Sequence, residues 1–306
     1  MQKQKLTAAG FLVTLTGAIL FSTKAIIVKI AFANTAVDAL SLLTLRMIFS
    51  LPFYLVAAWL ISSKTGNVRL NKRQWLMVII LGVLGYYLSS LFDFLGLQYI
   101  SAGLERLILF LYPTFAVLLN RMIFKQKLNR NQKLALLLTY AGIGVVFFGE
   151  LKIDPANDQF LWGSFLIFLC AVTYSFYLVG SGRLIPYTGA FKFTAYSMLV
   201  ATAGILVHFA IASDYDMLIG SKGIWYYGLL LAVVATVIPS FFLASGIKKI
   251  GSNNVAIISS IGPVSTILQA HFILGEKMFV EQVIGTILVI IGVILLGWNP
   301  KLSSQT

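Results

Sequence analysis

The chain has 306 residues, of which 59% are hydrophobic and 11% are charged, and its mean hydropathy is +0.91. This is more apolar surface than a soluble core of such length buries, which excludes a water-soluble globular enzyme. The net charge of +13 is spread over short connections and forms no basic and aromatic patch, so no nucleic-acid partner is expected.

Apolar stretches of about 20 residues recur along the chain, and each is long enough to cross a bilayer core of roughly 30 Å as a helix. They lack the two-residue alternation of barrel strands, so the sequence predicts an all-α membrane protein with ten transmembrane helices. The predicted spans are residues 8–32, 38–61, 74–98, 102–124, 131–149, 160–182, 190–212, 224–247, 253–274 and 280–298. The first is expected to be an anchor and not a cleaved signal peptide, because no clear cleavage site follows it.

The basic residues predict the orientation of these spans. When alternate connections are assigned to opposite sides of the membrane, most Lys and Arg residues fall on one side, including those at 64–73, 125–133 and 248–249. The other side holds Lys152, Lys222 and Lys277. Positive residues favour the cytoplasmic side, so both termini are predicted to be cytoplasmic, in the inner or plasma membrane of the cell.

An internal repeat is the most informative feature of the sequence. A shift of 150 residues aligns helices three to five with helices eight to ten without a gap, and a shift of 153 aligns helix one with helix six. The matched pairs include Trp75 with Trp225, Ser90 with Ser240, Gly96 with Gly246, Pro113 with Pro263 and Gln132 with Gln282. Equivalent positions are separated by an odd number of spans, which predicts two inverted five-helix repeats. Residues 1–149 form the first repeat, 150–160 an outer connecting loop and 161–306 the second repeat.

Pro113 and Pro263 lie near the middle of predicted helices four and nine. Each proline removes an N–H donor and leaves the carbonyl four residues earlier, Leu109 or Ser259, without its usual partner. Such carbonyls are tolerated at membrane depth where a polar cavity or a hinge satisfies them, so the two prolines are candidate hinges. Ordinary kinks that shape helix packing are the alternative.

Polar and aromatic side chains form stripes on several predicted helices. These stripes converge if helices one, three, four, six, eight and nine surround a common space, with helices five and ten as scaffold. The candidate cavity residues are Tyr86, Ser90, Tyr112, Tyr174, Tyr177, Thr236, Ser240, Ser259 and Thr266. For any single Ser or Thr, a hydrogen bond to its own helix is the competing interpretation.

Five ionisable side chains, Lys24, Arg46, Asp93, Glu105 and Arg106, lie inside predicted spans of the first repeat. Each requires a partner or water, because an unpaired charge in the membrane costs several kcal/mol. Their similar depth suggests an ion pair between Lys24 and Asp93. The two arginines are expected either to neutralise Glu105 or to bind an anionic group of a substrate.

These charges break the symmetry of the repeat, since Asp93 aligns with Leu243 and Lys24 aligns with Tyr177. Broken symmetry favours a functional gate or charge cluster over a role shared by both repeats. A buried structural ion pair is the alternative.

No constellation in the sequence indicates catalysis. The only cysteine, Cys170, lies in an apolar span, and Asp93 with Glu105 is the only intramembrane carboxylate pair. Gly-rich phosphate loops are absent, which argues against ATP-driven transport within this chain. We therefore expect a protein that is not an enzyme and has no cofactor and no metal site.

Several motifs resemble those of a known family. The run from Gly96 to Glu105, followed by Tyr112 and Pro113, is similar to the third-to-fourth helix segment of the drug/metabolite transporter superfamily, in its group with two EamA-type repeats. The Gly275-Glu276-Lys277 segment resembles the usual Gly-Glu pair of that family, and Gly285 and Gly292 resemble the glycines of its last helix. At the position of the Gly-Glu pair, the first repeat has Lys125-Gln126 instead.

The resemblance implies a secondary carrier in the inner membrane that moves a small metabolite, such as an amino acid or a related solute, by alternating access, with export as the expected direction. The expected partners are the lipid bilayer and a small-molecule substrate, with proton coupling through Asp93 as a subsidiary hypothesis. Two other classes remain open: a passive channel or facilitator, and a non-transporting receptor or assembly factor. The sequence does not predict the oligomeric state.

Overall fold

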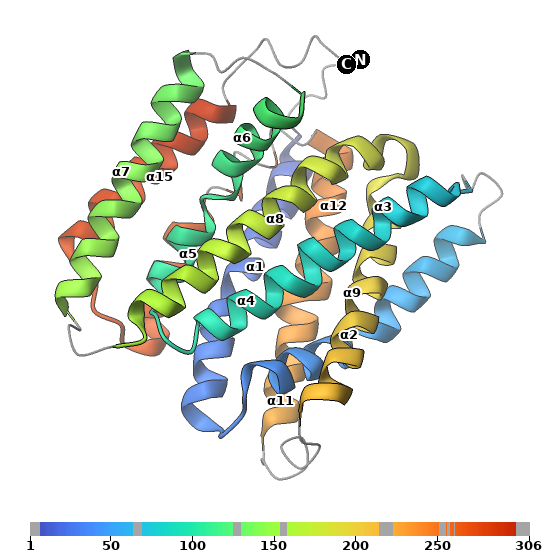
Figure 1. The fold of residues 1–306 in the computed structure, drawn as a ribbon, viewed down its shortest axis with the longest axis horizontal. Helices are drawn as coiled ribbons and strands as arrows, with labels where there is room; N and C mark the ends of the chain where they lie inside the picture. Colours follow the sequence, from blue (N-terminus) through green and yellow to red (C-terminus); the bar gives the residue numbers. More distant parts are fainter. Residues whose placement is uncertain are drawn as a thin grey trace.

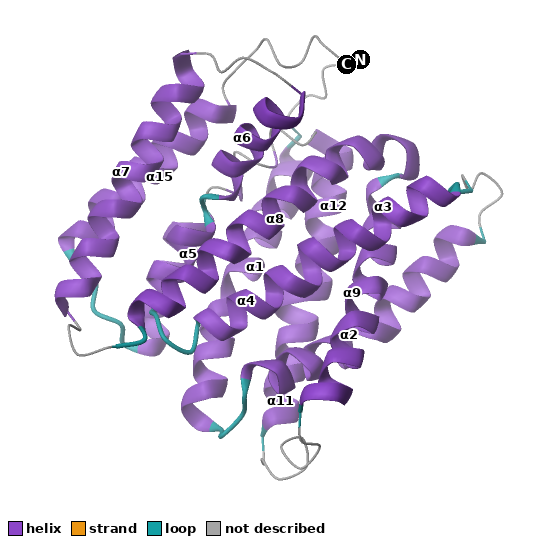
Figure 2. Ribbon diagram, in the orientation of Figure 1, coloured by secondary structure: helices purple, strands orange, loops and turns teal. Residues whose placement is uncertain are grey.

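The computed structural model describes residues 7–63, 69–124, 130–153, 158–213, 223–250, 255, 258–259 and 261–297. Every regular element in these ranges is helical, as Figure 2 shows. The all-α prediction is therefore confirmed for the described residues. Seven helical segments of this part are long and apolar enough to span a membrane: Ala8–Asn34, Ala39–Ser62, Lys72–Gly96, Ala102–Ile123, Phe160–Thr188, Ala190–Ala212 and Ile224–Gly246. Two further helical stretches, Leu136–Gly149 and Val280–Gly292, are also apolar but shorter. The total of ten spans remains a prediction.

In the first half, α1 spans Ala8–Asn34, α2 Ala39–Ser62, α3 Lys72–Gly82, α4 Ser89–Gly96, α5 Ala102–Leu109, α6 Tyr112–Phe124 and α7 Arg130–Ile153. In the second half, α8 spans Phe160–Thr188, α9 Ala190–Ala212, α11 Ile224–Ala232, α12 Ile238–Ile250, α14 Gly262–Gln269 and α15 Val280–Gly297. Within the described ranges, three π-helical segments occur at Val83–Leu88, Val233–Val237 and Ala270–Leu274. Within the predicted connection at 150–160, α7 continues to Ile153, α8 begins at Phe160, and residues 154–157 lie outside the described part.

Short polar side chains start several of these helices. Thr7 accepts a hydrogen bond from the backbone N–H of Gly10, and Asp38 accepts one from that of Ser41. Asn71 forms a reciprocal capping box with the residue three positions later, and the Ser101 hydroxyl caps α5. These contacts satisfy N–H groups that the first helical turn leaves without partners, so the caps explain why the apolar runs become helical where they do.

Neighbouring helices in the bundle pack antiparallel to one another (Figure 1). Helix α7 packs against α15 at one side of the molecule, α1 packs against α12, and α2 packs against α9. Gly142 on α7 lies so close to the backbone of Gly285 on α15 that a Cβ atom at either position would meet the other's carbonyl. Small residues of this kind let two membrane helices approach closely.

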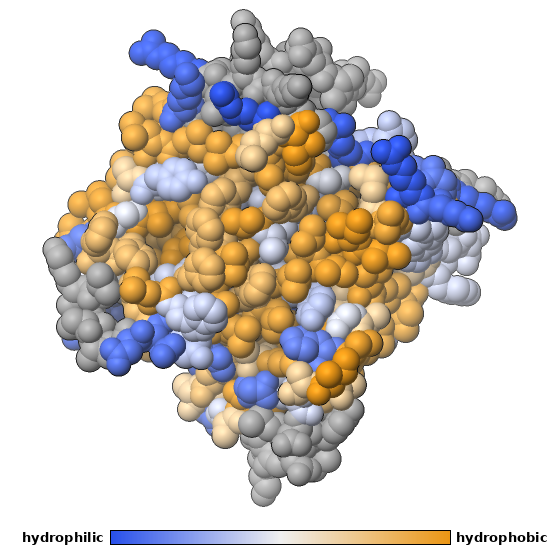
Figure 3. Space-filling model, viewed as in Figure 1, coloured by the Kyte–Doolittle hydropathy of each residue, from blue (hydrophilic) through white to orange (hydrophobic). Residues whose placement is uncertain are grey.

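The surface has the polarity expected of a protein in lipid. Large apolar side chains are exposed, including Trp59 (67% exposed), Ile211 (81%) and Phe272 (79%). Figure 3 shows hydrophobic residues across the middle of one face, with hydrophilic residues gathered toward opposite margins. Since charged side chains are buried inside, the distribution is the reverse of that in a soluble domain.

Backbone irregularities recur at the repeat spacing. The π-helical segments that begin at Val83 and Val233 are 150 residues apart, and so are the helix starts at Tyr112 and Gly262. The α5 and α6 helices are separated by a turn at residues 110–111, and α14 follows a turn residue, Ile261. The two halves therefore share these two interruptions at equivalent places, whereas the π-helical segment Ala270–Leu274 is equivalent to residues 120–124, which are part of the α-helix α6.

These interruptions correct the expectation that the prolines lie within continuous helices. Pro113 is the second residue of α6, and Pro263 is the second residue of α14. A proline in the first turn removes no intrahelical hydrogen bond, because that N–H has no partner in any case. The prolines thus start half-helices, and their role as hinges remains a prediction.

Candidate functional site

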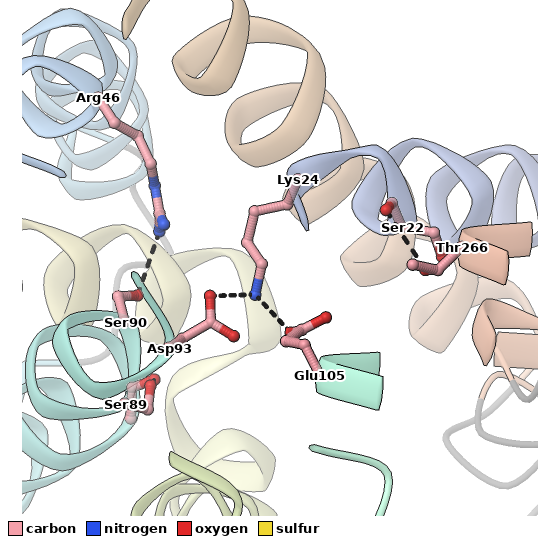
Figure 4. A network of polar contacts seen from close by, with 9 residues as sticks. Ser22, Lys24, Arg46, Ser89, Ser90, Asp93, Glu105 and Thr266 are labelled. Atoms are coloured by element: carbon pink, nitrogen blue, oxygen red, sulfur yellow. Dashed lines mark hydrogen bonds and ion pairs between the residues drawn. The ribbon is translucent and has the colours of Figure 1, made fainter. Parts of the chain in front are cut away.

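A network of buried charges joins three helices of the first repeat. The Lys24 Nζ on α1 lies 2.7 Å from Asp93 Oδ2 on α4 and 3.5 Å from Glu105 Oε1 on α5 (Figure 4). Their side chains are 9%, 1% and 0% exposed, so all three are shielded from bulk water. The structure contains the Lys24–Asp93 ion pair expected from the sequence, and it adds Glu105 to the same ammonium group.

Arg46 on α2 lies at the other side of Asp93 in Figure 4. Its Nη2 donates a 3.3 Å hydrogen bond to the Ser90 hydroxyl, and its guanidinium carbon lies 5.4 Å from the centre of the Phe94 ring. Its Nε and Nη1 make no hydrogen bond with the described residues. A buried guanidinium with two unused donors is costly, because those N–H groups have left water without a replacement partner.

Arg106 on α5 is more isolated. Its guanidinium carbon lies 5.6 Å from the centre of the Phe21 ring and its head group lies against Gly262, where any side chain would collide with it. The Arg106 Nε donates no hydrogen bond within the described part of the chain. Among the described residues, the salt bridge to Glu105 comes from Lys24, so neither arginine takes the expected role of its direct partner.

The buried charges do not balance. Lys24, Arg46 and Arg106 are cations at neutral pH, whereas Asp93 and Glu105 supply two carboxylates, so the cluster carries one surplus positive charge when all five are ionised. Asp93 Oδ1 and Glu105 Oε2 accept no hydrogen bond from the described residues. No group of three His, Cys, Asp or Glu side chains in that part of the chain has a metal-binding arrangement.

Four of the predicted cavity residues form one aromatic row. The hydroxyls of Tyr86 and Tyr177 are 2.9 Å apart, the rings of Tyr177 and Tyr174 stack with centroids 5.6 Å apart, and Tyr174 meets Tyr112 edge to face at 5.1 Å. The row connects the π-helical segment after α3, helix α8 and the start of α6. Helices from both repeats therefore contribute to it.

The predicted serines of the third and eighth helices make equivalent contacts with α2. Ser90 accepts the hydrogen bond from Arg46, and the Ser240 hydroxyl lies 2.9 Å from the hydroxyl of Tyr54. Tyr54 is fully buried and was not among the residues predicted from the sequence. Its position eight residues after Arg46 puts both on one face of α2, which is the signal that would have identified it.

The remaining predicted polar residues lie apart from the tyrosines. The Thr266 hydroxyl lies 3.4 Å from the backbone oxygen of Ser22, which joins α14 to α1. The Thr236 hydroxyl bonds the carbonyl of Leu231 in its own helix, as the competing interpretation held. Ser259 is half-buried in a helical turn before α14. The predicted cavity set is thus distributed over several separate contacts.

Glu276 has a role that the sequence comparison between repeats did not reveal. Its Oε1 accepts a 3.0 Å hydrogen bond from the backbone N–H of Ala102, the first residue of α5. A carboxylate in this place caps the helix and offsets the partial positive charge of its N-terminus. The Gly-Glu pair of the second repeat therefore holds the helix of the first repeat that carries Glu105 and Arg106.

Comparison with known proteins agrees with this architecture. The model of the EamA-like transporter family matches residues 8–148 and 161–298. The chain belongs to the EamA-like transporter family. It is 31% identical over 287 residues to the transporter YcbK of Bacillus subtilis, covering 91% of this chain and 89% of that protein. The inner membrane transporter YicL of Salmonella typhimurium is 21% identical over 297 residues, covering 96% and 97%.

A crystal structure of another protein superposes on this EamA-family chain with a TM-score of 0.66 over 94% of both chains, at 18% identity. This likeness shows a shared fold. Together with the seven long apolar helices, the family match makes the chain a multi-pass integral membrane protein of a transporter family.

Proposed function

We propose that this EamA-family protein is a secondary transporter that exports a small metabolite across the cell membrane by alternating access. The observation that carries the proposal is the pair of helix interruptions, before Tyr112 and before Gly262, at equivalent positions of the two repeats and next to the buried charges. Transporters built from inverted repeats place their substrate sites at such discontinuous helices near the bilayer midplane.

The proposed architecture has ten spans, two inverted five-helix repeats and cytoplasmic termini. The repeats are residues 1–149 and 161–306, with the outer connection at 150–160 between them. The equal spacing of the π-helical segments at Val83 and Val233 supports this division, because related repeats carry the same irregularity at the same place. Such segments also often mark functional sites within helices. Rocking of one repeat against the other would then expose the central residues to each side in turn.

In this mechanism the ion pair of Lys24 with Asp93 and Glu105 acts as a gate. Because one ammonium group holds carboxylates on two helices, loss of either contact loosens α1 from α4 or from α5. The tyrosine row provides an amphipathic wall beside it, and Pro113 and Pro263 mark the hinges. Only interactions that differ between the two conformations drive such an exchange.

The test is a counterflow measurement in proteoliposomes, preceded by a screen for solutes that become toxic or accumulate when the protein is deleted or overproduced. A carrier accumulates labelled substrate when unlabelled substrate is present inside. We expect Asp93→Asn and Lys24→Ala each to lower this exchange at least tenfold while the protein still inserts. Asp158→Asn, which changes an exposed carboxylate outside the cluster, is the matched control.

Each competing class predicts a different result. A passive channel shows flux without trans-stimulation, and a receptor or assembly factor binds a ligand without flux. Unchanged exchange in both cluster variants would remove the ion pair from the transport mechanism.

Proton coupling is a finer part of the proposal. Two carboxylates that share one ammonium group, Asp93 and Glu105, provide a place where one proton can be gained or lost during the cycle. An imposed pH gradient should then change the rate of uptake into vesicles, and Asp93→Asn should abolish that response. Flux that is indifferent to the gradient would contradict proton coupling.

A further inference from the structure

The surplus positive charge of the buried cluster indicates what kind of ligand would complete it. Lys24 is already shared by two carboxylates, so the surplus resides on the arginines. Arg46 is 4% exposed and uses one donor on Ser90, and Arg106 is 6% exposed with its Nε unused within the described residues. Protonation of either carboxylate would increase the surplus, so an anion is favoured in both protonation states of the pair.

Arg106 points to the place where such an anion would bind. Its guanidinium lies against Gly262, the first residue of α14, where the absence of a side chain leaves room for it. At the start of α14, Pro263 has no N–H group and the Ser265 N–H donates to the Ile261 carbonyl, which leaves the N–H groups of Gly262 and Val264 as first-turn donors beside the partial positive charge of the helix end. A guanidinium and a helix N-terminus repel each other when they adjoin alone, whereas an anion placed beside both would be bound by both.

The tyrosine row lies next to this position and gives the rest of the ligand a surface. Tyr112 begins α6 directly after the α5 helix that carries Arg106, and Tyr86 lies one turn before Ser90, which accepts the hydrogen bond from Arg46. Stacked and edge-to-face rings offer flat apolar area with hydroxyl groups at the margin. This surface suits the body of an organic solute better than a small inorganic anion.

We infer that the substrate class of this transporter is an organic monoanion, whose carboxylate binds Arg106 and the N-terminal end of α14 while its apolar body lies along the tyrosine row. The inference rests on the proposed transport function and specifies its substrate. A monoanion neutralises the single surplus charge of the cluster, whereas a zwitterion such as an amino acid brings no net charge. Guanidinium groups also match the geometry of carboxylates, because two parallel N–H donors face two oxygens.

The first experiment measures dissociation constants by calorimetry on the purified full-length protein in a neutral detergent, without anionic lipid. The probes are benzoate, phenylacetate and 3-phenylpropanoate, each paired with its neutral amide, and phenylalanine as the zwitterionic relative of the last. We expect at least one carboxylate to bind tenfold or more tightly than its amide, and phenylalanine to bind more weakly than 3-phenylpropanoate. No carboxylate preference in any pair, or a preference for phenylalanine, would overturn the inference.

The second experiment assigns the preference to Arg106. Arg106→Gln should raise the dissociation constant of the preferred carboxylate at least tenfold and leave that of the amide unchanged, and Arg106→Lys should give an intermediate value. Arg73→Gln removes an exposed guanidinium in the first turn of α3 and should change neither dissociation constant. A carboxylate preference that survives in a monodisperse Arg106→Gln protein would overturn the assignment. If that variant does not fold, the wild-type comparison of acid with amide still decides the substrate class.

The two proposals fail in different ways. Counterflow of a neutral or zwitterionic solute without carboxylate binding would leave the transport function intact and reject the monoanion. Carboxylate binding through Arg106 without any flux would support the anion site and reject the transport function.

Discussion

The two repeats have the same backbone plan but different interiors. Each has a π-helical segment at the same place, Val83 or Val233, and each starts a half-helix at the same place, Tyr112 or Gly262. The five-residue charge cluster, however, belongs to the first repeat: Asp93 aligns with Leu243, and Glu105 aligns with Val255. These backbone irregularities are thus common to both halves, while the charge cluster comes from one.

This difference separates two requirements of the proposed transport function, namely conformational exchange and recognition of a ligand. In the proposed alternating-access mechanism, a symmetric backbone would let the two repeats exchange conformations. An asymmetric charge cluster gives the site a defined polarity. The following substitutions test the comparison, beginning with the largest expected effect.

Removal of Lys24 should have the largest effect, because it leaves two buried carboxylates without their shared cation. We expect Lys24→Met to lower the free energy of unfolding by about 3–5 kcal/mol, measured by detergent-induced unfolding in mixed micelles. Lys249→Met, which removes an exposed lysine on α12, is the control and should change little. Addition of Asp93→Asn to Lys24→Met should recover part of the lost free energy of unfolding. If the double variant loses as much as the two single variants together, the ion pair is not the cause of the loss.

A carboxylate placed in the second repeat should be costly where the first repeat tolerates one. Leu243→Asp puts an acid at the position equivalent to Asp93, without a lysine opposite it. We expect a loss of about 2.5–3.5 kcal/mol in apparent membrane insertion or stability. Leu243→Asn is the uncharged control and should cost less. Equal effects of the two substitutions would show that the asymmetry of charge has no energetic basis.

The π-helical segments should differ in their tolerance of a methyl group. Gly85 lies against the Tyr177 ring, and its equivalent in the second repeat is the buried Ala235. Gly85→Ala should destabilise the protein by about 1–3 kcal/mol, because the ring must move away from Tyr86. Ala235→Gly should cost only about 0.5–1 kcal/mol through backbone entropy. Unfolding curves of the two variants make this comparison, and a larger loss for Ala235→Gly would contradict it.

The smallest expected difference concerns the two equivalent serines. Ser90→Ala removes the hydrogen-bond partner of the charged Arg46, and Ser240→Ala removes that of the neutral Tyr54. Hydrogen bonds to charged groups contribute more, so we expect losses of about 1.5 and 1 kcal/mol respectively. Thermal unfolding in detergent, with both variants measured side by side, resolves them, and the reverse order would indicate that Arg46 finds another partner.

Much of this could be predicted from the residues alone. Hydropathy indicated an all-helical membrane protein, the 150-residue shift indicated equivalent halves, and the shared depth of Lys24 and Asp93 indicated their ion pair. Depth is readable because each helical residue advances about 1.5 Å along the axis, so sequence position specifies height in the membrane. The aromatic row was partly foreseen, since Tyr174 and Tyr177 are close in sequence.

Other features required the tertiary structure. Which side chains meet at a given depth depends on how each helix is rotated and which helix lies beside it, and apolar sequences leave both open. Contacts of this kind place Glu105 on the same ammonium as Asp93, Tyr54 on Ser240, and Glu276 on the start of α5. The helix interruptions were also missed, because a proline in sequence indicates a break but not whether the helix bends there or begins again.

The residues themselves determined that this protein lies in a membrane, the depth of each polar group in the bilayer and the existence of two related halves, because these follow from local composition and spacing. The packing of the helices decided which charges are paired and which arginines keep donors that no described residue accepts from. Such contacts depend on distances of a few ångströms between chain segments far apart in sequence, such as Tyr54 and Ser240, which are 186 residues apart, and only the assembled bundle sets those distances.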